Sequence, residues 1–210
     1  MAENKIKVVH EKEKRTKKSV VWEYAEAIVI AVILALIIRK FVIQAYKIPS
    51  GSMLETLQIG DHILVNKFIY YFKEPERGDI IVFKYPKDQK RDFIKRLIGL
   101  PGETLEIKDK KVFINGELLD EPYAVFKDTE TFYFNPYART RDNYGPRIIP
   151  ENCYFMMGDN RDYSQDSRYW GLLDRELIEG KALLIYWSWN KNGQGLLEKV
   201  RWDRIGDLLH

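Results

Sequence analysis

The hydrophobic pattern of this chain changes near residue 43. Residues 20–43 are mostly apolar, and the run Ala27–Ile38 carries no charge and would be apolar on every face of a helix. Arg39 and Lys40 follow this run, and their long side chains can carry the charge out to water. Because a bilayer core about 30 Å thick needs about 20 helical residues, segment 20–43 predicts a transmembrane anchor.

Two other interpretations of this segment fit less well. A cleavable signal peptide has small residues just before its cleavage site, whereas here Arg39 and Lys40 follow the run and Ala45 has Ile43 two positions before it. A buried helix of a water-soluble domain normally carries a polar stripe, which Ala27–Ile38 lacks. The pattern therefore favours an anchor that is not cleaved.

After residue 43 the pattern changes to short apolar or alternating runs separated by Gly, Pro and Asp, which is typical of β-strands. Several strands with little helix predict a mainly β fold, either an antiparallel sheet or a barrel-like domain. Residues 120–150, rich in Tyr, Phe, Pro, Asn and Arg, predict an extended excursion. The expected strands are His62–Tyr70, Asp79–Tyr85, Asp92–Ile98, Thr104–Ile107, Lys111–Ile114, Cys153–Met157 and Lys181–Trp189.

Positive charge is concentrated at the N-terminus. The whole chain has 34 Lys and Arg against 31 Asp and Glu, and this near balance indicates no nucleic-acid surface. Residues 1–18 carry a net charge of +4 and residues 19–210 a net charge of −1, which together give the +3 of the whole chain. By the positive-inside rule we expect residues 1–19 to be a cytoplasmic basic tail, residues 20–43 the anchor and residues 44–210 one extracytoplasmic domain.

The cysteine and histidine residues predict neither a disulfide bond nor a metal site. Cys153 is the single cysteine, so no intrachain disulfide can form. His10, His62 and His210 lie far apart and lack a ligand spacing such as two histidines four apart on a helix. We therefore expect neither a metal nor another cofactor.

A turn with two hydroxyl groups follows the apolar segment. It contains Ser50 and Ser52 within Tyr46–Met53, which is interrupted by proline and glycine. Ser52 and Glu55 also have the spacing of a capping box, in which the serine caps a short helix and the glutamate reaches back. Capping boxes are common and nucleophilic serines are rare, so this stretch by itself favours the cap.

A nucleophilic serine needs a base. His62 is poorly supported as the base of a catalytic triad, because the chain has no Gly-x-Ser-x-Gly elbow. Lys95 shares a predicted strand face with Phe93 and Leu97, where burial would lower the pKa of its ammonium and allow it to act as a base. The neighbouring Arg96 stays protonated in any protein. The alternative is that both cations reach solvent from an edge strand.

The segment Gly158–Gly171 is dense in polar side chains. A calcium-binding loop needs an oxygen ligand at its third position and glycine at its sixth, where this chain has Arg161 and Ser164. That kind of site is excluded. The interleaved acidic and basic residues instead predict a loop that is braced by its own ion pairs and presents hydroxyl groups.

Taken together and in this order, these segments resemble the signature boxes of bacterial type I signal peptidases over nearly the whole chain from the anchor onward. The resemblance implies a single-pass, membrane-anchored serine endopeptidase with a Ser-Lys dyad, whose catalytic domain is residues 44–210. Its partners would be the signal peptides of exported preproteins, cut after small residues at the outer face of the cytoplasmic membrane, and the phospholipid bilayer. The boxes are Pro49–Met53, Gly60–Lys67, Arg77–Asp79, Lys95–Glu103 and Gly158–Gly171.

The resemblance also implies roles for individual residues. Ser52 matches the nucleophile and Lys95 the general base. The hydroxyl of Ser164 matches the group that orients the lysine, and that of Ser50 matches the group that joins the Ser52 N–H in the oxyanion hole. The supporting residues are Asp159, Asp166 and Arg168, and the substrate-pocket residues are Ile48, Met53, Leu57, Phe93 and Ile94.

Two positions depart from the family pattern, because Glu55 replaces a usual proline and Tyr71 a common glycine. Two other functions fit the sequence less well. An inactive homologue acting as a scaffold or substrate-binding module would normally lack Ser52 or Lys95, and both are present. A self-cleaving Ser-Lys regulator would carry a DNA-binding helix-turn-helix, whereas residues 1–43 offer only a charged tail and an apolar run.

Overall fold

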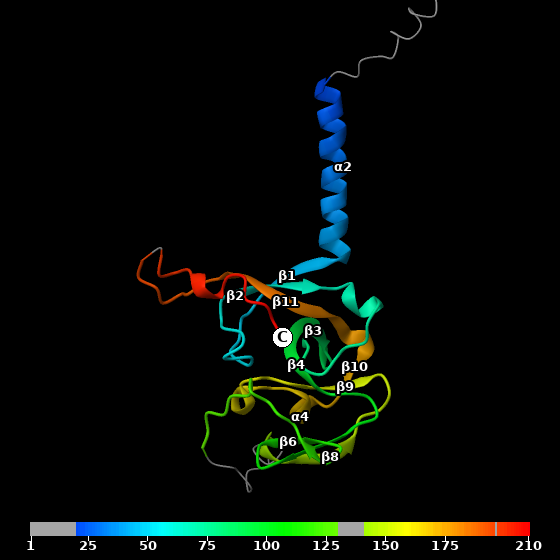
Figure 1. Ribbon diagram of the computed structural model, residues 1–210, viewed down its shortest axis with the longest axis vertical. Helices are drawn as coiled ribbons and strands as arrows, with labels where there is room; N and C mark the ends of the chain where they lie inside the picture. The colour runs from blue at the N-terminus through cyan, green and yellow to red at the C-terminus, as the bar shows by residue number, and fades with distance from the viewer. Residues whose placement is uncertain (1–19, 130–140, 196) are drawn as a thin grey trace, which may run out of the picture. The chain divides into compact units, whose positions relative to one another are not determined.

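The computed structural model describes residues 20–129, 141–195 and 197–210 (Figure 1). The chain divides into two compact units, a first that ends at Lys40 and a second, Phe41–His210. All strands found in the described residues belong to the second unit.

Helix α2 (Val20–Phe41) forms where the apolar run lies, and it is drawn as an unbroken helix in Figure 1. Its described side chains, Trp22–Leu36, are all exposed. The helix ends two residues before the predicted end of the anchor, because Ile43 already pairs with Asn66 as the first residue of strand β1. Within the described residues, no helix is both long enough and apolar enough to count as a membrane span.

A seven-stranded sheet forms the larger part of the second unit. Its strand order is β1-β2-β11-β3-β4-β9-β10, and all its pairings are antiparallel. Mainly β structure with antiparallel pairing is what the alternating pattern predicts. The strands are β1 (Ile43–Lys47), β2 (Asp61–Asn66), β3 (Ile80–Tyr85), β4 (Asp88–Gly99), β9 (Cys153–Met157), β10 (Leu173–Asp174) and β11 (Ile178–Ser188).

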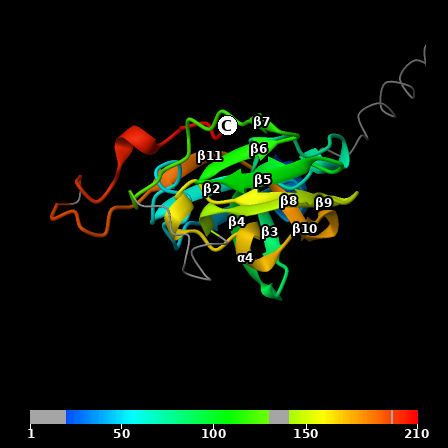
Figure 2. The same ribbon diagram turned by 90° about the horizontal axis from the view of Figure 1, so that it is seen from below.

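A second, four-stranded sheet has the order β7-β6-β5-β8, and Figure 2 shows these strands side by side. The turn between β6 and β7 contains Asn115 and Gly116, both with positive φ, as a tight hairpin requires. Its strands are β5 (Thr104–Lys108), β6 (Lys111–Ile114), β7 (Glu117–Leu118) and β8 (Tyr144–Ile148). The short helices are α4 (Ser167–Trp170) and four 3-10 turns, Ile69–Tyr71, Arg161–Tyr163, Arg175–Leu177 and Trp202–Arg204.

The observed strands confirm the seven predicted ones, with the predicted bounds for β6 and β9 and shifted ends for the other five. Strand β2 is shorter than predicted because the Asn66 side chain accepts hydrogen bonds from the N–H groups of Phe68 and Ile69, which bends the chain. Strand β8 lies within the predicted excursion 120–150. Residues 130–140 of that excursion lie outside the described residues.

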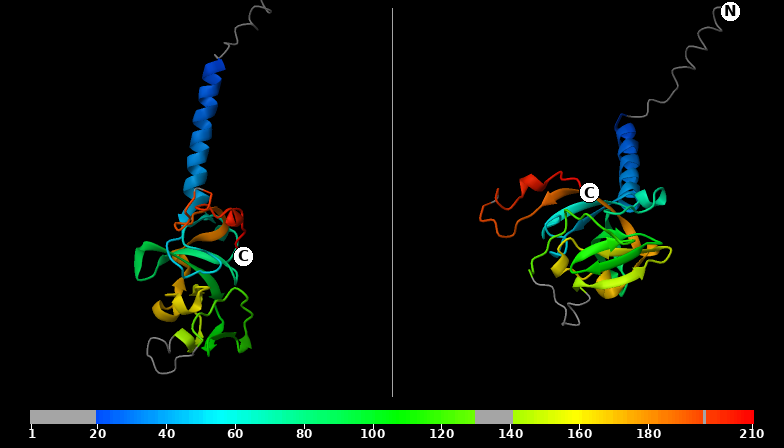
Figure 3. Two further views of the ribbon diagram at one scale, coloured as in Figure 1. Left: turned by 90° about the vertical axis from the view of Figure 1, so that its left-hand side faces the viewer. Right: turned by 60° about the horizontal axis from the view of Figure 1, so that its bottom comes forward.

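The C-terminal segment completes the core of the large sheet. It follows β11 (Figure 3), where Leu209 N donates to Leu183 O at 2.8 Å. The Leu209 side chain is buried in the same apolar cluster as Ile48, Met53 and Leu57. Segments at opposite ends of the second unit therefore share one core.

A buried carboxylate ties the C-terminal segment to the start of β2. Asp61 is fully buried, and its oxygens accept from Ser188 Oγ at 2.6 Å and from Arg204 Nη2 at 2.7 Å. Arg201 Nη2 lies 3.4 Å from the same carboxylate. Because a buried charge is stable only when it is paired, these cations offset the cost of placing Asp61 inside the protein.

Candidate active site

The Ser52 loop, residues 48–60, joins β1 to β2. Residues 51–57 form turns, in which Leu57 N donates to Met53 O at 2.7 Å. The side chains of Met53 and Leu57 are fully buried in the core below. Two apolar anchors thus fix the loop to the sheet and leave Ser52 partly exposed.

The capping-box interpretation of Ser52 is wrong. No helix begins directly after Ser52, because residues 51–57 form turns and bends. Glu55 is exposed and makes no hydrogen bond back to the serine in the described part of the chain. The Ser52 hydroxyl is therefore free for another partner.

That partner is Lys95 on β4. Lys95 Nζ lies 2.7 Å from Ser52 Oγ and 2.8 Å from the carbonyl oxygen of Ile94. The Lys95 side chain is 4% exposed, and β4 lies between β3 and β9 rather than at an edge. The alternative in which this lysine reaches solvent from an edge strand is therefore wrong.

Burial lowers the pKa of Lys95 from 10.5 to about 8. The negative charges of Asp166 and Asp159 oppose this shift, and the positive charge of Arg168 adds to it. A substantial fraction of Lys95 is thus neutral in mildly alkaline solution. A neutral amine at hydrogen-bond distance can accept the proton of a serine hydroxyl.

Ser164 lies close to Ser52 across Gly158. A methyl group added to Gly158 would come 2.3 Å from Ser164 Oγ and 2.4 Å from the Ser52 carbonyl oxygen, so only glycine fits between them. The Ser164 side chain is buried, and its hydroxyl makes no hydrogen bond of normal geometry in the described residues, although it helps to lower the pKa of the Asp166 carboxyl. A buried hydroxyl without a partner is uncommon and points to a use other than stability.

Asp159 connects the two segments that carry Ser52 and Lys95. Its carboxylate accepts two hydrogen bonds from Arg96, at 2.9 and 2.8 Å, and both side chains are almost completely buried. Thr56 Oγ1, on the Ser52 loop, donates to the same carboxylate at 2.6 Å. The fork of hydrogen bonds therefore holds β4, the Ser52 loop and the Gly158–Gly171 segment together.

Asp166 and Arg168 form a second buried ion pair inside the Gly158–Gly171 segment. Arg168 binds both carboxylate oxygens of Asp166, each at 2.8 Å. Burial by itself would raise the pKa of Asp166, but the charge and hydrogen bonds of Arg168 lower it below its usual value. Asp166 also accepts from Gly158 N at 3.1 Å, so this pair holds the glycine beside Ser52.

Asn160 is a site residue that the sequence analysis did not single out. Its side-chain Nδ2 donates to Gly51 O at 2.9 Å, and its backbone N donates to Ser52 O at 3.2 Å. Its place in the polar segment, next to Asp159, was the one available signal, because nothing in the local sequence names Gly51 as its partner. Asn160 thus contacts the backbone on both sides of Ser52.

The two other candidate residues, Ser50 and His62, make no hydrogen bond with the Ser52 hydroxyl in the described part of the chain. Ser50 is exposed and lies two residues before Ser52 on the same loop. His62 Nδ1 lies 3.1 Å from Gly60 O, and the ring faces Tyr186 with 6.0 Å between the centroids. The structure gives His62 no contact with Ser52, whose hydroxyl is already taken by Lys95.

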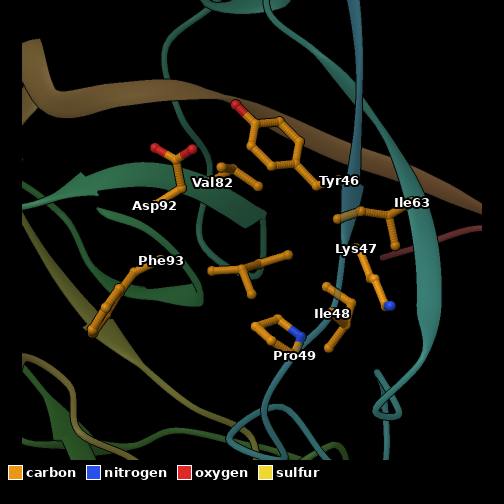
Figure 4. Close-up of a pocket in the computed structure, with 9 residues that line it drawn as sticks. Tyr46, Lys47, Ile48, Pro49, Ile63, Val82, Asp92 and Phe93 are labelled. Atoms are coloured by element: carbon orange, nitrogen blue, oxygen red, sulfur yellow. The ribbon is translucent and has the colours of Figure 1, made fainter. Parts of the chain in front are cut away.

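A small pocket opens between β1 and β4 next to the Ser52 loop, with a volume of about 40 Å³ (Figure 4). Three predicted pocket residues line it, namely Ile48, Phe93 and Ile94, while Met53 and Leu57 lie in the core. A second pocket of about 450 Å³ lies beside Gly51 and Asn160. The remaining lining residues of the first are Tyr46, Lys47, Pro49, Ile63, Val82 and Asp92, and those of the second are Gly51, Lys127, Asn160 and Tyr163.

Metal-binding groups are not gathered at this site. Across the described residues no cluster of three or more His, Cys, Asp or Glu side chains has a geometry suited to a metal ion.

The sequence matches the family described as "Signal peptidase, peptidase S26" over residues 21–187. It is 38% identical to a probable signal peptidase I-2 of Synechocystis, over 89% of this chain and 83% of the relative. It is 38% identical to signal peptidase I S of Bacillus subtilis, over 84% of this chain and 94% of the relative. A crystal structure of a signal peptidase I from Enterococcus faecalis is 38% identical, with a TM-score of 0.42 over 52% of this chain and 97% of that one.

Proposed function

Because this chain belongs to the signal peptidase family, peptidase S26, and is a serine peptidase, we propose that it removes N-terminal signal peptides from exported preproteins with Ser52 and Lys95 as its catalytic dyad. The observation that carries the proposal is the 2.7 Å contact between Ser52 Oγ and the buried Lys95 Nζ. A serine beside a neutral amine is an established arrangement for acyl transfer.

The first step forms the acyl-enzyme. Neutral Lys95 takes the proton of the Ser52 hydroxyl while Ser52 Oγ attacks the carbonyl carbon of the scissile bond. The C–N bond then breaks, and the protonated Lys95 returns a proton to the leaving amine. In the second step Lys95 accepts a proton from water, whose oxygen attacks the ester carbonyl carbon. The C–O bond to Ser52 then breaks, and the protonated Lys95 returns its proton to Ser52 Oγ, which leaves both groups as they began.

Developing negative charge on the carbonyl oxygen needs donors. We assign these to the Ser52 N–H and the Ser50 hydroxyl, which is exposed on the same loop and free to turn toward a substrate. We assign to Ser164 the orientation of Lys95, an assignment supported by its buried hydroxyl, which has no partner in the described residues. The ion pairs of Asp159 and Asp166 hold these groups in place.

The two pockets suggest how a substrate lies. The first pocket is small, with a volume of about 40 Å³, so it suits a small side chain before the cleaved bond. Its apolar walls, Ile48, Phe93 and Ile94, favour alanine over polar residues. The larger pocket, beside Gly51 and Asn160, offers room for further residues of the substrate.

We also propose that α2 anchors the enzyme in the cytoplasmic membrane with the N-terminus inside and residues 44–210 outside. The exposed apolar side chains of α2 and the +4 charge of residues 1–18 support this topology. Protease added to spheroplasts should digest the C-terminal part of the chain. Protection of that part would refute the topology without touching the proposed chemistry.

Cleavage of one preprotein by the purified protein in detergent tests the dyad. Ser52→Ala and Lys95→Ala should each abolish cleavage, and the double variant should be hardly worse than either single variant because the two groups act as one unit. Lys108→Ala, which changes an exposed lysine, is the matched control and should cleave normally.

The outcomes separate the alternatives. Appreciable cleavage by Ser52→Ala would place the nucleophile elsewhere, and cleavage by Lys95→Ala would reopen the case for His62. A wild-type protein that binds a preprotein without cutting it would favour the scaffold function.

A further inference from the structure

The peptide unit that joins Gly51 to Ser52 is held from one side by Asn160. Asn160 Nδ2 donates to Gly51 O at 2.9 Å, and Leu54 N donates to the same oxygen at 3.3 Å. A carbonyl oxygen can only accept, so the NH₂ end of the Asn160 amide must face Gly51. The orientation of this side chain is therefore fixed by its partner.

A trans peptide unit couples the direction of its carbonyl to that of its N–H, because the two groups point in opposite directions. Cis bonds occur in this structure only at Leu54–Glu55 and Gly145–Pro146 among the described residues, so the unit joining Gly51 to Ser52 is trans. Holding Gly51 O toward Asn160 thus aims the Ser52 N–H away from Asn160. Among the described residues this N–H has no acceptor, so it is available to a substrate.

Donation to the carbonyl also changes the strength of the N–H. A hydrogen bond to one end of a peptide unit polarises it and strengthens the bond formed at the other end. The Asn160 amide is 3% exposed, so water competes little for this contact. Asn160 consequently affects both the aim and the strength of the Ser52 N–H.

We propose that Asn160 is a positioning residue of the oxyanion hole, which acts through the peptide unit joining Gly51 to Ser52. The inference rests on the proposed function, in which the Ser52 N–H binds the oxyanion. Asn160 touches no reacting atom. Loss of a whole oxyanion donor lowers kcat about 100- to 1,000-fold. Loss of the group that aims a donor should cost less, about 10- to 100-fold.

The backbone around Asn160 is held independently of its side chain. Val125 N donates to Asp159 O at 2.8 Å, and Arg161 N donates to Val125 O at 2.9 Å. The Asn160 N–H bond to Ser52 O also survives truncation of the side chain. Asn160→Ala and the similarly sized Asn160→Leu should therefore fold and keep the loop in place.

Kinetics of these two variants on a preprotein test the proposal in the full-length protein. We expect kcat to fall about 10- to 100-fold with KM changed less than about threefold, because the lost contact acts on the transition state. The midpoint of the kcat/KM profile against pH should not move, since Asn160 makes no contact with Lys95. Asn190→Ala is the matched control, because the Asn190 side chain also binds a backbone group, accepting from Asn192 N at 3.0 Å in a remote turn.

A pair of inhibitors separates positioning from general damage. In a peptide aldehyde, Ser52 Oγ bonds to the carbonyl carbon, its proton passes to Lys95, and the resulting oxyanion occupies the proposed hole. The matching peptide alcohol cannot form this adduct. Asn160→Ala should weaken the aldehyde by the same factor as kcat/KM and leave the affinity for the alcohol unchanged.

Three results would overturn the inference: an unchanged kcat in both variants, equal weakening of aldehyde and alcohol, or a shifted pH midpoint with a lowered Tm. Ser52→Ala is measured in parallel. If that variant still cleaves, the proposed function fails. If it is inactive while Asn160→Ala has full activity, only the role of Asn160 fails.

Discussion

Lys95 Nζ lies within 2.7 Å of Ser52 Oγ although 43 residues separate the two in sequence, and the lysine is buried at that contact. Burial lowers the pKa of Lys95 to about 8, so acidification below that value protonates the base. We therefore expect kcat/KM to fall about tenfold per pH unit below about pH 8 and to level off above it.

A profile from about pH 5 to about pH 10 checks this expectation. Lys95→Arg is the matched variant, because it keeps the positive charge but cannot lose its proton at any working pH. It should be inactive throughout. A flat wild-type profile, or an active Lys95→Arg enzyme, would mean that Lys95 is only a structural cation.

Ser164→Ala should separate activity from stability. When the Ser164 hydroxyl is removed, the Asp166 carboxylate beside it keeps its hydrogen bonds from Arg168 and from Gly158 N, so no buried group is left unsatisfied. We expect Tm to stay the same or rise slightly while kcat falls without reaching zero, since the hydroxyl orients the base but transfers no proton. A drop in Tm with unchanged kcat would assign Ser164 to packing instead.

Gly158→Ala should damage the site directly. The added methyl group would lie 2.3 Å from Ser164 Oγ and 2.4 Å from Ser52 O, so one of these groups has to move. Overpacking of this kind costs about 1–3 kcal/mol of unfolding free energy and should also strongly lower kcat. Gly195→Ala is the control, because its nearest neighbour would be the flexible Glu198 side chain at 4.0 Å. Equal activity in the two variants would contradict the tight approach.

Arg96→Ala should unfold the protein far more readily than a change in an exposed ion pair. It leaves the buried Asp159 carboxylate without its cation, which costs about 3–5 kcal/mol of unfolding free energy. Arg91→Ala, which breaks an exposed pair with Asp88, should have little effect. Urea unfolding of both variants measures the difference, and similar midpoints would show that Asp159 is supported by other groups.

Alternation of apolar and polar residues predicted the main strands, since pairing buries one face of each, but it missed β1. Ile43–Lys47 continues directly from the apolar run of α2, so no polar break marks the change from helix to strand. Strand β4 begins at Asp88, four residues before its predicted start, because residues 88–91 are polar and their pairing depends on the turn after Tyr85.

The candidate site was predictable in its residue types more than in its contacts. The apolar neighbours of Lys95 indicated a buried base, and the order of the boxes pointed to Ser52. By contrast, the partner of Asn160 is the backbone of Gly51, 109 residues away, and any residue there offers the same carbonyl oxygen. A contact of that kind leaves no mark in local sequence and becomes visible only in the folded chain.

The contacts of the C-terminal segment with Asp61 also have a consequence for a chain that is still being synthesised. A nascent chain made only as far as residue 200 already contains Ser52 and Lys95, yet it lacks Arg201 and Arg204, the cations that offset the buried Asp61 charge. It also lacks Leu209, which fills the core beneath the Ser52 loop. We therefore expect a growing chain to carry Ser52 and Lys95, the proposed dyad, before the contacts that support their loop have formed.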